Sequence, residues 1–507
     1  MNSDIQKLRG HLARKPSDGE AWLSLAQLLS QQSPGRELFH SIEQAIRSLP
    51  DRYECWALAA TVQGQLNGLQ QATRWLEQSC QQNADLVAPR LALASLLSEN
   101  KPDTALAICN QLDADLPADL SVIATLIRGD ALRCKAWWKT AYETYQSVLD
   151  KRADDPLLHN NLGCCLVGEG KFAEAEACFR TALAHDPNLH LAQLNLALLH
   201  VHLQRAPQTA SALEELLADK TLPSDLEQAA RMSLLVLKEN MHRQAALDRT
   251  VQDWSVSRLQ DALNRSESRR HPPDAASINL LQNLAGQCNR LPGEPLVQQP
   301  AGDSREWAFA ETCSIHKIPV ERWPEDYQRL LRNESQAVPA AWRVLSDRNR
   351  LDSALLAGHH AEAWLCLWHA RLMSGHPESL PGQYKLAWNR IGYHPTTPPA
   401  AVSATLNIVL TDLLPKLTAG YPRAVFLYLA ISKIHAFVDG NGRLARCMMG
   451  WECRSRGLPP VVMTPAFHDQ HVAGLRVALD GGNIDALWRA MAASTQDAAK
   501  HLAGLAN

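Results

Sequence analysis

The sequence predicts a mostly all-α protein, in which a solenoid of helical repeats is followed by a second helical domain with one small β-hairpin. Three observations lead to this prediction. The first half repeats with a period of about 34 residues, and the second half places a glycine-rich loop between two apolar helical runs. Hydrophobic residues make up 46% of the 507 residues, so ordinary cores can be buried.

Charge and cysteine usage exclude several classes of protein. The net charge is −3, from 50 basic and 53 acidic residues, so we expect no nucleic-acid partner. The twelve cysteines are scattered and form no paired C-x-x-C clusters of the zinc-binding kind. Reduced, mostly buried thiols are therefore expected.

The N-terminal segment MNSDIQKLRGHLARKP lacks the apolar region of a signal peptide, and the sequence has no apolar run long enough to span a bilayer. We therefore expect a soluble, cytoplasmic protein without a membrane span. Delivery by a specialised secretion system can leave no signal of this kind, so a translocated effector stays open.

One unit of the repeat is clear, at residues 156–189. It has a large and then a tiny residue in the first helix, small residues where two helices cross, and a proline at the end: Leu162, Gly163, Ala175, Phe179, Ala182 and Pro187. The small residues let two helices approach closely, and the proline ends the second helix.

The same frame fits the residues from Gly19 and from Tyr53, and weaker units follow at 87–121, around Gly129 and from His190. This series resembles the tetratricopeptide-repeat family, whose concave face commonly holds a peptide or a partner protein. The resemblance implies that the array recruits a target or partner. A rigid spacer or a dimerisation arm is the alternative, and a homodimer stays open.

Changes in composition set the expected domain boundaries. The repeat array covers residues 1–221, and a helical cap without a clear repeat covers 222–263. Residues 264–303 contain SESRRHPPD and further Gly and Pro, which is typical of a partly ordered linker. The second domain is expected at 304–507, with its core at about 340–495.

The segment that carries chemistry begins at His435 and reads HAFVDGNGRLAR. A glycine-rich loop that ends on a helix N-terminus binds anions, because backbone N–H groups and the helix dipole point at the ligand. A histidine can take a proton from a hydroxyl, and the Asp439 carboxylate suits Mg²⁺ that bridges phosphates. Phe437 should be buried and anchor the loop.

Five further residues are expected to bind phosphate. The glycines permit close backbone approach, the asparagine offers an amide donor, and the arginines offer planar forks. These residues are Gly440, Asn441, Gly442, Arg443 and Arg446.

The segment resembles the signature of the Fic family, His-x-Phe-x-Asp/Glu-Gly-Asn-Gly-Arg with a second arginine three residues on, and every specified position is present. The resemblance implies a protein adenylyltransferase with ATP as substrate and Mg²⁺ on Asp439. His435 would deprotonate a Tyr, Thr or Ser hydroxyl of a target protein, which attacks the α-phosphorus and releases pyrophosphate. The alternatives are another donor (UMP, GMP, phosphate or phosphocholine) and a non-catalytic interaction scaffold.

A second part of the resemblance concerns target binding. Residues 381–395, PGQYKLAWNRIGYHP, look like the family's β-hairpin flap, which aligns the target chain by strand addition. Gln383, Tyr384 and Lys385 are the expected target-aligning residues. The sequence departs from the family pattern at Lys385, where arginine is frequent, and at Ala436, where proline is frequent.

Many Fic proteins also resemble one another in an inhibitory helix, which reads Ser/Thr, three residues, Glu, then Gly or Asn, and whose glutamate pairs with the second motif arginine. The expected counterpart is a degenerate motif with Ser353 and Gly358, in which Ala357 replaces the glutamate. A literal match beginning at Ser95 lies inside the repeats and is expected to be a helix end. His369 and the neighbouring histidines show no zinc spacing, so they are expected to be surface or flap-supporting residues, and no metal other than Mg²⁺ is expected.

Overall fold

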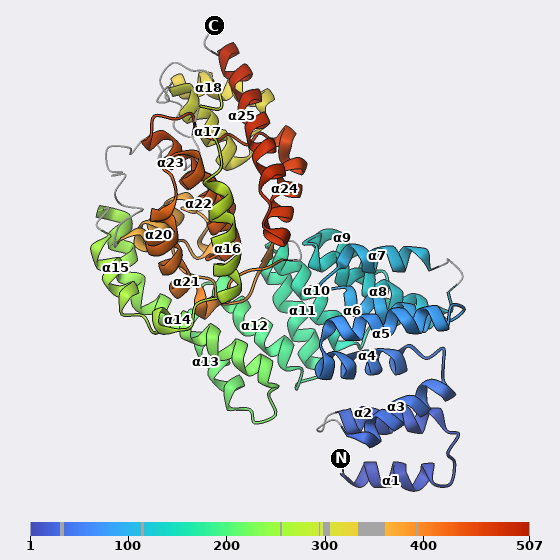
Figure 1. Cartoon of the computed structure of the whole chain (residues 1–507). Coiled ribbons are helices and arrows are strands. Elements are labelled where there is room, and N and C mark those ends of the chain that lie inside the picture. Colours follow the sequence, from blue (N-terminus) through green and yellow to red (C-terminus); the bar gives the residue numbers. More distant parts are fainter. Residues whose placement is uncertain are drawn as a thin grey trace. The chain divides into compact units, whose positions relative to one another are not determined.

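The computed structural model describes residues 2–30, 35–112, 116–253, 256–293, 295–297, 305–332, 360–391 and 394–505. These residues are mainly α-helical and contain one two-stranded antiparallel sheet, which confirms the predicted fold class. The chain divides into two compact units, Met1–Ala192 and Gln193–Asn507 (Figure 1). Within the described part, no helix has the length and apolarity needed to cross a membrane.

The first unit is built of consecutive antiparallel helix pairs, which follow the predicted repeats (Figure 1). Its helices are α1 (Asn2–Leu12), α2 (Gly19–Ser30), α3 (Arg36–Ser48), α4 (Tyr53–Asn67), α5 (Leu69–Gln82), α6 (Ala88–Leu97), α7 (Pro102–Gln111), α8 (Ala118–Cys134), α9 (Trp138–Gln146), η1 (Leu149–Lys151), α10 (Pro156–Gly168) and α11 (Phe172–His185).

Close approach inside a repeat depends on the predicted small residues. A Cβ atom built on Gly163 of α10 would lie 2.6 Å from the ring of Phe179 on α11. In the preceding repeat, a Cβ on Gly129 would lie 2.4 Å from the ring of Tyr145. Each glycine therefore makes room for the aromatic ring of its partner helix.

The literal inhibitory match beginning at Ser95 forms the end of α6 and the turn before α7, as expected. Asn100 lies in this turn and donates from its backbone N–H to the Leu97 carbonyl over 3.2 Å. Its φ angle is not positive, so it does not cap the helix in the left-handed conformation.

The second unit holds the end of the array and the remaining helices. Its elements are α12 (His190–His202), α13 (Ala206–Ala218), α14 (Ser224–Asp253), α15 (Ser257–Asn264), η2 (Glu267–Arg270), α16 (Ala275–Cys288), α17 (Arg305–His316), η3 (Val320–Arg322), α18 (Trp323–Leu331), α20 (Ala361–Leu372), η7 (Pro377–Ser379), β1 (Arg390–Ile391), β2 (His394–Pro395), η8 (Pro399–Ala401), α21 (Val402–Ile408), η9 (Val409–Leu413), η10 (Leu414–Lys416), α22 (Tyr421–Ile434), α23 (Asn441–Ser455), η11 (Pro465–Phe467), α24 (His468–Gly481) and α25 (Asp485–Leu505).

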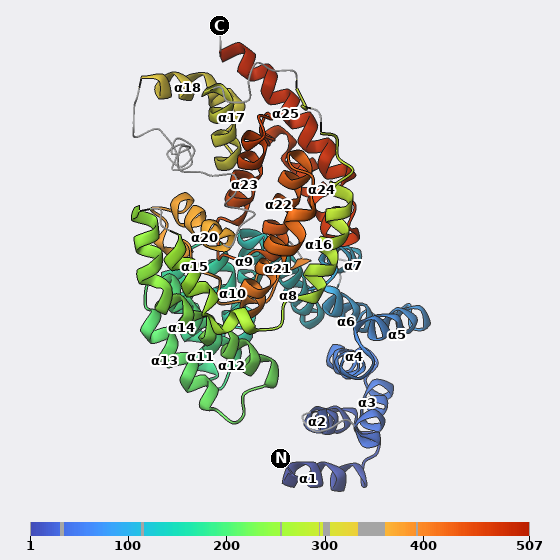
Figure 2. The same cartoon turned by 60° about the vertical axis from the view of Figure 1, so that its left-hand side comes forward.

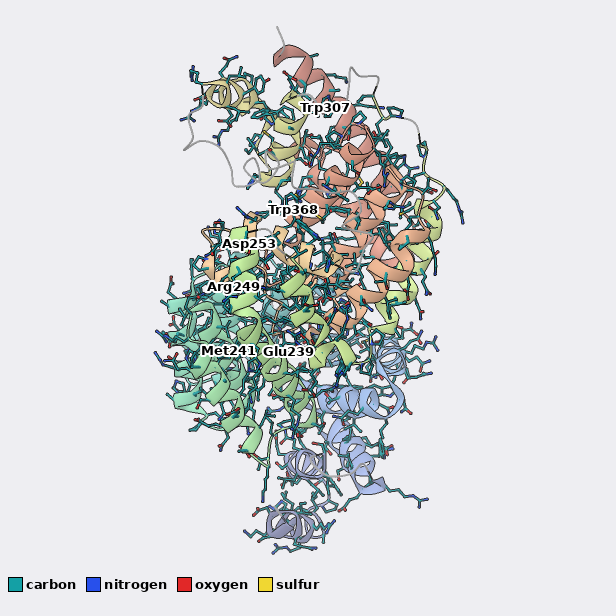
Figure 3. The ribbon with its side chains drawn as sticks, turned by 90° about the vertical axis from the view of Figure 1, so that its left-hand side faces the viewer. Glu239, Met241, Arg249, Asp253, Trp307 and Trp368 are labelled. Atoms are coloured by element: carbon teal, nitrogen blue, oxygen red, sulfur yellow. The ribbon has the colours of Figure 1, made fainter. Side chains whose placement is uncertain are left out.

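The stretch expected to be a linker contains two packed elements, η2 and α16. Glu239 on α14 (Figure 3) accepts a hydrogen bond of 2.7 Å from the backbone N–H of Ser268 in η2. Asp274 caps α16 through the backbone N–H of Ser277, and Leu281 and Leu284 of α16 are fully buried in the core of the unit. The prolines and glycines that suggested a linker therefore flank helices that belong to the fold.

Helix α22 runs through the middle of the core of the second unit, with α23 packed beside it (Figure 2). Most of its residues are buried, among them Tyr421, Phe426 and Leu429. A helix that is apolar on every face must be covered on every face. Here α16, α21 and α23 all pack against it, and they hold the loop between α22 and α23 in place.

Candidate functional site

The glycine-rich loop joins two packed helices and is bounded by two left-handed residues. His435 ends α22 with φ 52° and ψ 55°, and Gly440 precedes α23 with φ 80°. A Cβ on Gly440 would lie 2.5 Å from Sδ of Met373, so only glycine fits at this turn. Phe437 between them is 1% exposed, which confirms its predicted anchoring role.

His435 is held as a neutral base. Its Nδ1 lies 3.3 Å from the Ser432 carbonyl oxygen. Because a carbonyl only accepts, Nδ1 carries the proton and Nε2 is left as the acceptor. Burial, together with the charge of Lys385, lowers the pKa of His435 to about 4. At neutral pH the ring can therefore take a proton at Nε2.

Asn441 has a different role from the one we predicted. Its side chain was expected to donate to a phosphate oxygen. Instead Oδ1 accepts from the Phe437 N–H over 3.0 Å, and Nδ2 donates to the Phe437 carbonyl over 2.8 Å. The side chain is 2% exposed. It closes the loop on itself because both ends of the amide bind the loop backbone.

The two arginines lie at the start of α23 without acidic partners. Arg443 donates from Nη1 to Met373 Sδ over 3.2 Å, and Arg446 donates from Nη2 to the Ile315 carbonyl over 2.9 Å. The Arg446 Nε is buried and has no hydrogen-bond partner within the described part of the chain. Among the described residues no carboxylate forms an ion pair with either arginine, and no side chain caps the N-terminus of α23. This arrangement suits a bound phosphate chain.

Asp439 is exposed, and within the described ranges its carboxylate makes no hydrogen bond or ion pair. The same ranges contain no cluster of three metal-binding side chains. A single free carboxylate fits Mg²⁺, which proteins commonly hold by one or two carboxylates together with substrate phosphates and water. The predicted Mg²⁺ ligand therefore has the chemistry that such a site needs.

His369 on α20 supports the flap, as one of the two sequence interpretations expects, but its contact with the glycine-rich loop was not predicted. Its Nε2 donates to the Asp439 carbonyl over 2.7 Å, and its Nδ1 accepts from the Gly382 N–H over 2.8 Å. The ring stacks on Phe437 at 3.8 Å between centroids and is fully buried, which lowers the pKa of His369 to about 4. One neutral side chain thus joins the loop to the start of the predicted flap.

The predicted target-aligning side chains point into the protein. Lys385 is 1% exposed and donates from Nζ to Asn389 Oδ1 (2.6 Å) and Thr396 Oγ1 (2.7 Å), and burial holds its pKa well below the usual value. Tyr384 is 2% exposed and donates to Glu362 Oε1 over 2.6 Å, and Gln383 donates to Gln244.

These contacts correct the prediction that the three side chains face a target. The side chains point inward because the segment packs between α14 and the glycine-rich loop. Gln383 bonds Gln244 of α14, and the Lys385 N–H donates to the Ala436 carbonyl of the loop over 3.0 Å. That the segment as a whole aligns a target stays a prediction. Among its described residues, Trp388 is a large apolar side chain that is 61% exposed, and it lies two residues before β1.

The strand pair is shorter than the predicted hairpin at 381–395. Strands β1 and β2 pair Arg390 with Pro395 and Ile391 with His394. Residues 381–389 run from α20 toward β1 without regular structure and are held by helix α14, whose Asn240 donates to the Tyr384 carbonyl over 2.9 Å.

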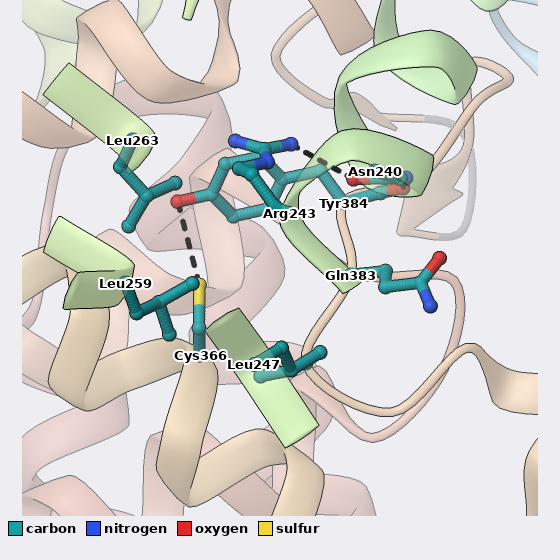
Figure 4. Close-up of a pocket in the computed structure, with 9 residues that line it drawn as sticks. Asn240, Arg243, Leu247, Leu259, Leu263, Cys366, Gln383 and Tyr384 are labelled. Carbon is teal, nitrogen blue, oxygen red and sulfur yellow. Dashed lines mark hydrogen bonds between the residues drawn. The ribbon is translucent and has the colours of Figure 1, made fainter. Parts of the chain in front are cut away.

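A small cavity lies where α14, α15 and α20 meet this segment (Figure 4). Its volume of about 10 Å³ suits a single water molecule and not a nucleotide. Arg243, Cys366 and Tyr384 line it, and the Arg243 guanidinium lies 5.3 Å from the centre of the Tyr384 ring. The cavity is therefore part of the packing behind the flap and not the substrate site.

Residues Ser353, Ala357 and Gly358 of the predicted degenerate inhibitory motif lie outside the described residues. Within the described residues, the segment at Arg446 is the end of α17, where Ile315 accepts its hydrogen bond. The sequence there, TCSIHK from Thr312, reads Thr, three residues, His, Lys. It keeps the first position of the inhibitory pattern, and it has His316 where that pattern has glutamate.

Comparison with known proteins identifies two parts of the chain. Residues 360–453 match the model of the Fic/DOC family, and residues 156–189 match that of the tetratricopeptide repeat. No curated protein sequence matches the chain.

Two solved structures are among those similar to the chain. Fic-1 from C. elegans is 16% identical and aligns over 80% of this chain and 98% of its own, with a TM-score of 0.29. A human IFIT1 dimer with PPP-AAAA is 16% identical and aligns over 55% of this chain and 72% of its own, with a TM-score of 0.36. Because both TM-scores are low, these likenesses carry no argument about function.

Proposed function

Residues 360–453 form a Fic/DOC domain in a chain that also carries tetratricopeptide repeats, and on this premise we propose that the protein is a protein adenylyltransferase. It transfers AMP from ATP to a Tyr, Thr or Ser hydroxyl of a target protein. The observation that carries the proposal is that one loop holds a neutral base at one end and, at the other, two arginines that form no ion pair with an acidic residue in the described part of the chain.

The electrostatics of the loop support a triphosphate donor. Arg443, Arg446 and the unpaired N–H groups at the start of α23 are all donors, so the loop offers several sites for phosphate oxygens. When Mg²⁺ is bound, it neutralises phosphate charge, and Asp439 would hold it.

The reaction needs one proton acceptor and one leaving group. The target hydroxyl gives its proton to His435 Nε2 as its oxygen forms a bond to the α-phosphorus. The bond from the α-phosphorus to the bridging oxygen breaks, and pyrophosphate leaves with that electron pair. The loop is closed by Asn441 before substrate arrives, so His435 and the start of α23 need no rearrangement to act together.

The repeats support a second element of the proposal, which is recruitment of the target protein or of an adaptor. Solenoid faces are commonly used to bind peptides and proteins. The Fic domain would then modify a protein that the array has concentrated nearby, which raises the rate without any new contact at the loop.

The test is incubation of the purified protein with α-labelled ATP, GTP, UTP or CTP, Mg²⁺ and a lysate that offers targets, followed by separation on a gel. We expect labelled protein with ATP. His435→Ala should lower the labelling rate by about a hundredfold to ten-thousandfold, because the base is lost.

A matched control is His242→Ala, at an exposed histidine on α14, which should label like the wild type. Labelling by another triphosphate would support the same type of reaction, nucleotidyl transfer, with a different donor. Absence of label with every triphosphate, or equal labelling by His435→Ala, would reject the proposal.

A further inference from the structure

The C-terminal end of α17, which contacts Arg446 through the Ile315 carbonyl, is followed by a lysine. After His316 the chain passes through Lys317 at φ 54°, and the Ile318 N–H donates back to the Cys313 carbonyl over 2.9 Å. This is the left-handed helix end at which glycine is the usual residue. A lysine therefore occupies a backbone conformation that its type rarely adopts, and such positions cluster at functional sites.

The position of this helix end is set by packing along α17. Trp307 near its start (Figure 3) is 1% exposed. The Glu311 carboxylate lies 2.6 Å from Arg454 Nε on α23, and Ser314 Oγ accepts from the Met463 N–H over 2.9 Å. Glu311, Ser314 and Ile315 thus join α17 to α23 and to the segment after it, which fixes the backbone at the end of α17 near Arg446.

The end of α17 brings three basic residues together: Lys317, Arg443 and Arg446. Lys317 lies two residues after Ile315, whose carbonyl accepts from Arg446 over 2.9 Å, and burial together with the charges of Arg446 and Arg443 lowers the pKa of Lys317. In the part of the chain that the structure describes, no carboxylate forms an ion pair with any of them. Glu311, the acidic residue of α17 nearest to them in sequence, forms an ion pair with Arg454.

A buried histidine lies beside these cations. His471 on α24 is 8% exposed, and burial followed by the charge of Arg446 lowers the pKa of His471 to about 3. Its Nε2 and the Nε of Arg446 are both buried, and neither has a hydrogen-bond partner among the residues that the structure describes. Buried polar atoms in native proteins are usually paired, so unpaired ones beside converging cations indicate the place of an anionic ligand.

We propose that Lys317 extends the pair Arg443 and Arg446 into a subsite for the terminal phosphate of a nucleoside triphosphate. The inference rests on the proposed function, because it takes the loop before α23 as the place of the inner phosphates. Lys317 is then the residue that makes the protein prefer triphosphates over diphosphates and monophosphates, since only a triphosphate reaches a third cation.

The test is a comparison of dissociation constants measured by titration calorimetry with Mg²⁺. The probes are α,β-methylene ATP, which cannot be cleaved at the α-phosphorus, α,β-methylene ADP and AMP. We expect Lys317→Gln to weaken binding of the triphosphate analogue about tenfold and to change binding of the other two less than about twofold. Lys317→Arg keeps the charge and should keep the preference for the triphosphate.

A matched control is Lys416→Gln, at an exposed lysine of the same unit that has no interaction with the arginine pair, and it should bind like the wild type. Equal affinities of wild type and Lys317→Gln for the triphosphate analogue would overturn the inference, while target labelling would leave the proposed function standing. An equal loss for all three probes would also overturn it, because Lys317 would then act on nucleotides in general. A wild type that binds none of the probes would reject both proposals together.

Discussion

His435 shows how backbone and burial together prepare one side chain. The left-handed backbone turns its ring back toward the Ser432 carbonyl, which takes the proton of Nδ1. Burial disfavours the charged form, and the nearby Lys385 acts in the same direction. The result is a base that stays neutral at pH values where an ordinary histidine would be half protonated.

This predicts an unusual pH dependence. Because a base works only when it is unprotonated, and the pKa of His435 is about 4, activity should persist until the pH falls toward that value. We expect the acid limb of kcat/KM to have its midpoint between about pH 4 and 5, and not near the ordinary histidine value of about 6.5. Nucleotide binding measured over the same range separates chemistry from binding. A midpoint near 6.5 would show that the ring is charged more easily than its burial implies.

His369 acts through other residues and is therefore a positioning residue. His369→Phe keeps a ring against Phe437 but removes both hydrogen bonds, to Asp439 and to Gly382. We expect kcat to fall about tenfold to a hundredfold, since each buried partner left unpaired costs about 1–3 kcal/mol. Binding of the nucleotide should change little, and His369→Gln, which can bond at both ends, should recover part of kcat. Equal losses in both variants with normal folding would show that the ring itself is required.

At the scale of elements, helix α14 is the support of the flap. Three of its polar side chains bond the segment before β1: Ser233 donates to the Leu386 carbonyl over 2.6 Å, Asn240 donates to the Tyr384 carbonyl, and Gln244 contacts Gln383. The sequence interpretation gave this helix only the role of a cap on the array. It therefore joins the last array helices to the part of the chain that is proposed to meet the target.

Asn240 and its neighbour Met241 allow a matched test of this support. Asn240 is 2% exposed, whereas Met241 is 45% exposed on the same helix. Asn240→Ala leaves the Tyr384 carbonyl unpaired, so we expect the free energy of unfolding to fall by about 1–3 kcal/mol and the backbone N–H of Lys385 to exchange faster. Met241→Ala should change neither quantity by much. Unchanged exchange in Asn240→Ala would mean that the flap does not depend on α14.

Helices with a packing signal in the sequence were predictable, and contacts between distant segments were not. The pair of Gly163 and Phe179 marks a repeat because size alternation follows directly from helix packing. The hydrogen bond between His369 and Asp439 joins residues 70 positions apart, and no local sequence pattern predicts it. The sequence predicts that Asn441 binds the ligand, because residue type alone cannot show that its side-chain amide is hydrogen-bonded to the loop backbone.

At the scale of the whole molecule, the chain has two compact units, each with cores of its own. The stability of the first unit is expected to depend on packing within that unit. The loop in the second unit is expected to depend on contacts within residues 193–507. Nucleotide binding should therefore be separable from the stability of the array.

Gly163→Ala tests this separation. Its new Cβ would meet the Phe179 ring at 2.6 Å, so we expect the first unit to lose about 1–3 kcal/mol of stability. The control is Gly10→Ala in α1, where nothing lies within 4 Å, and which should gain about 0.5–1 kcal/mol. Both variants should bind ATP like the wild type. A weaker affinity for ATP in Gly163→Ala would show that the units are coupled.

The left-handed backbone at His435 also determines which substitution could give an inactive variant that still binds its target. Asparagine adopts that conformation more readily than other residues with a side chain, whereas β-branched residues are strained there. His435→Asn should therefore keep the loop folded while it removes the base. Such a variant would act as a trap: it would hold nucleotide and target together without turnover, and cross-linking would then recover the bound protein for identification.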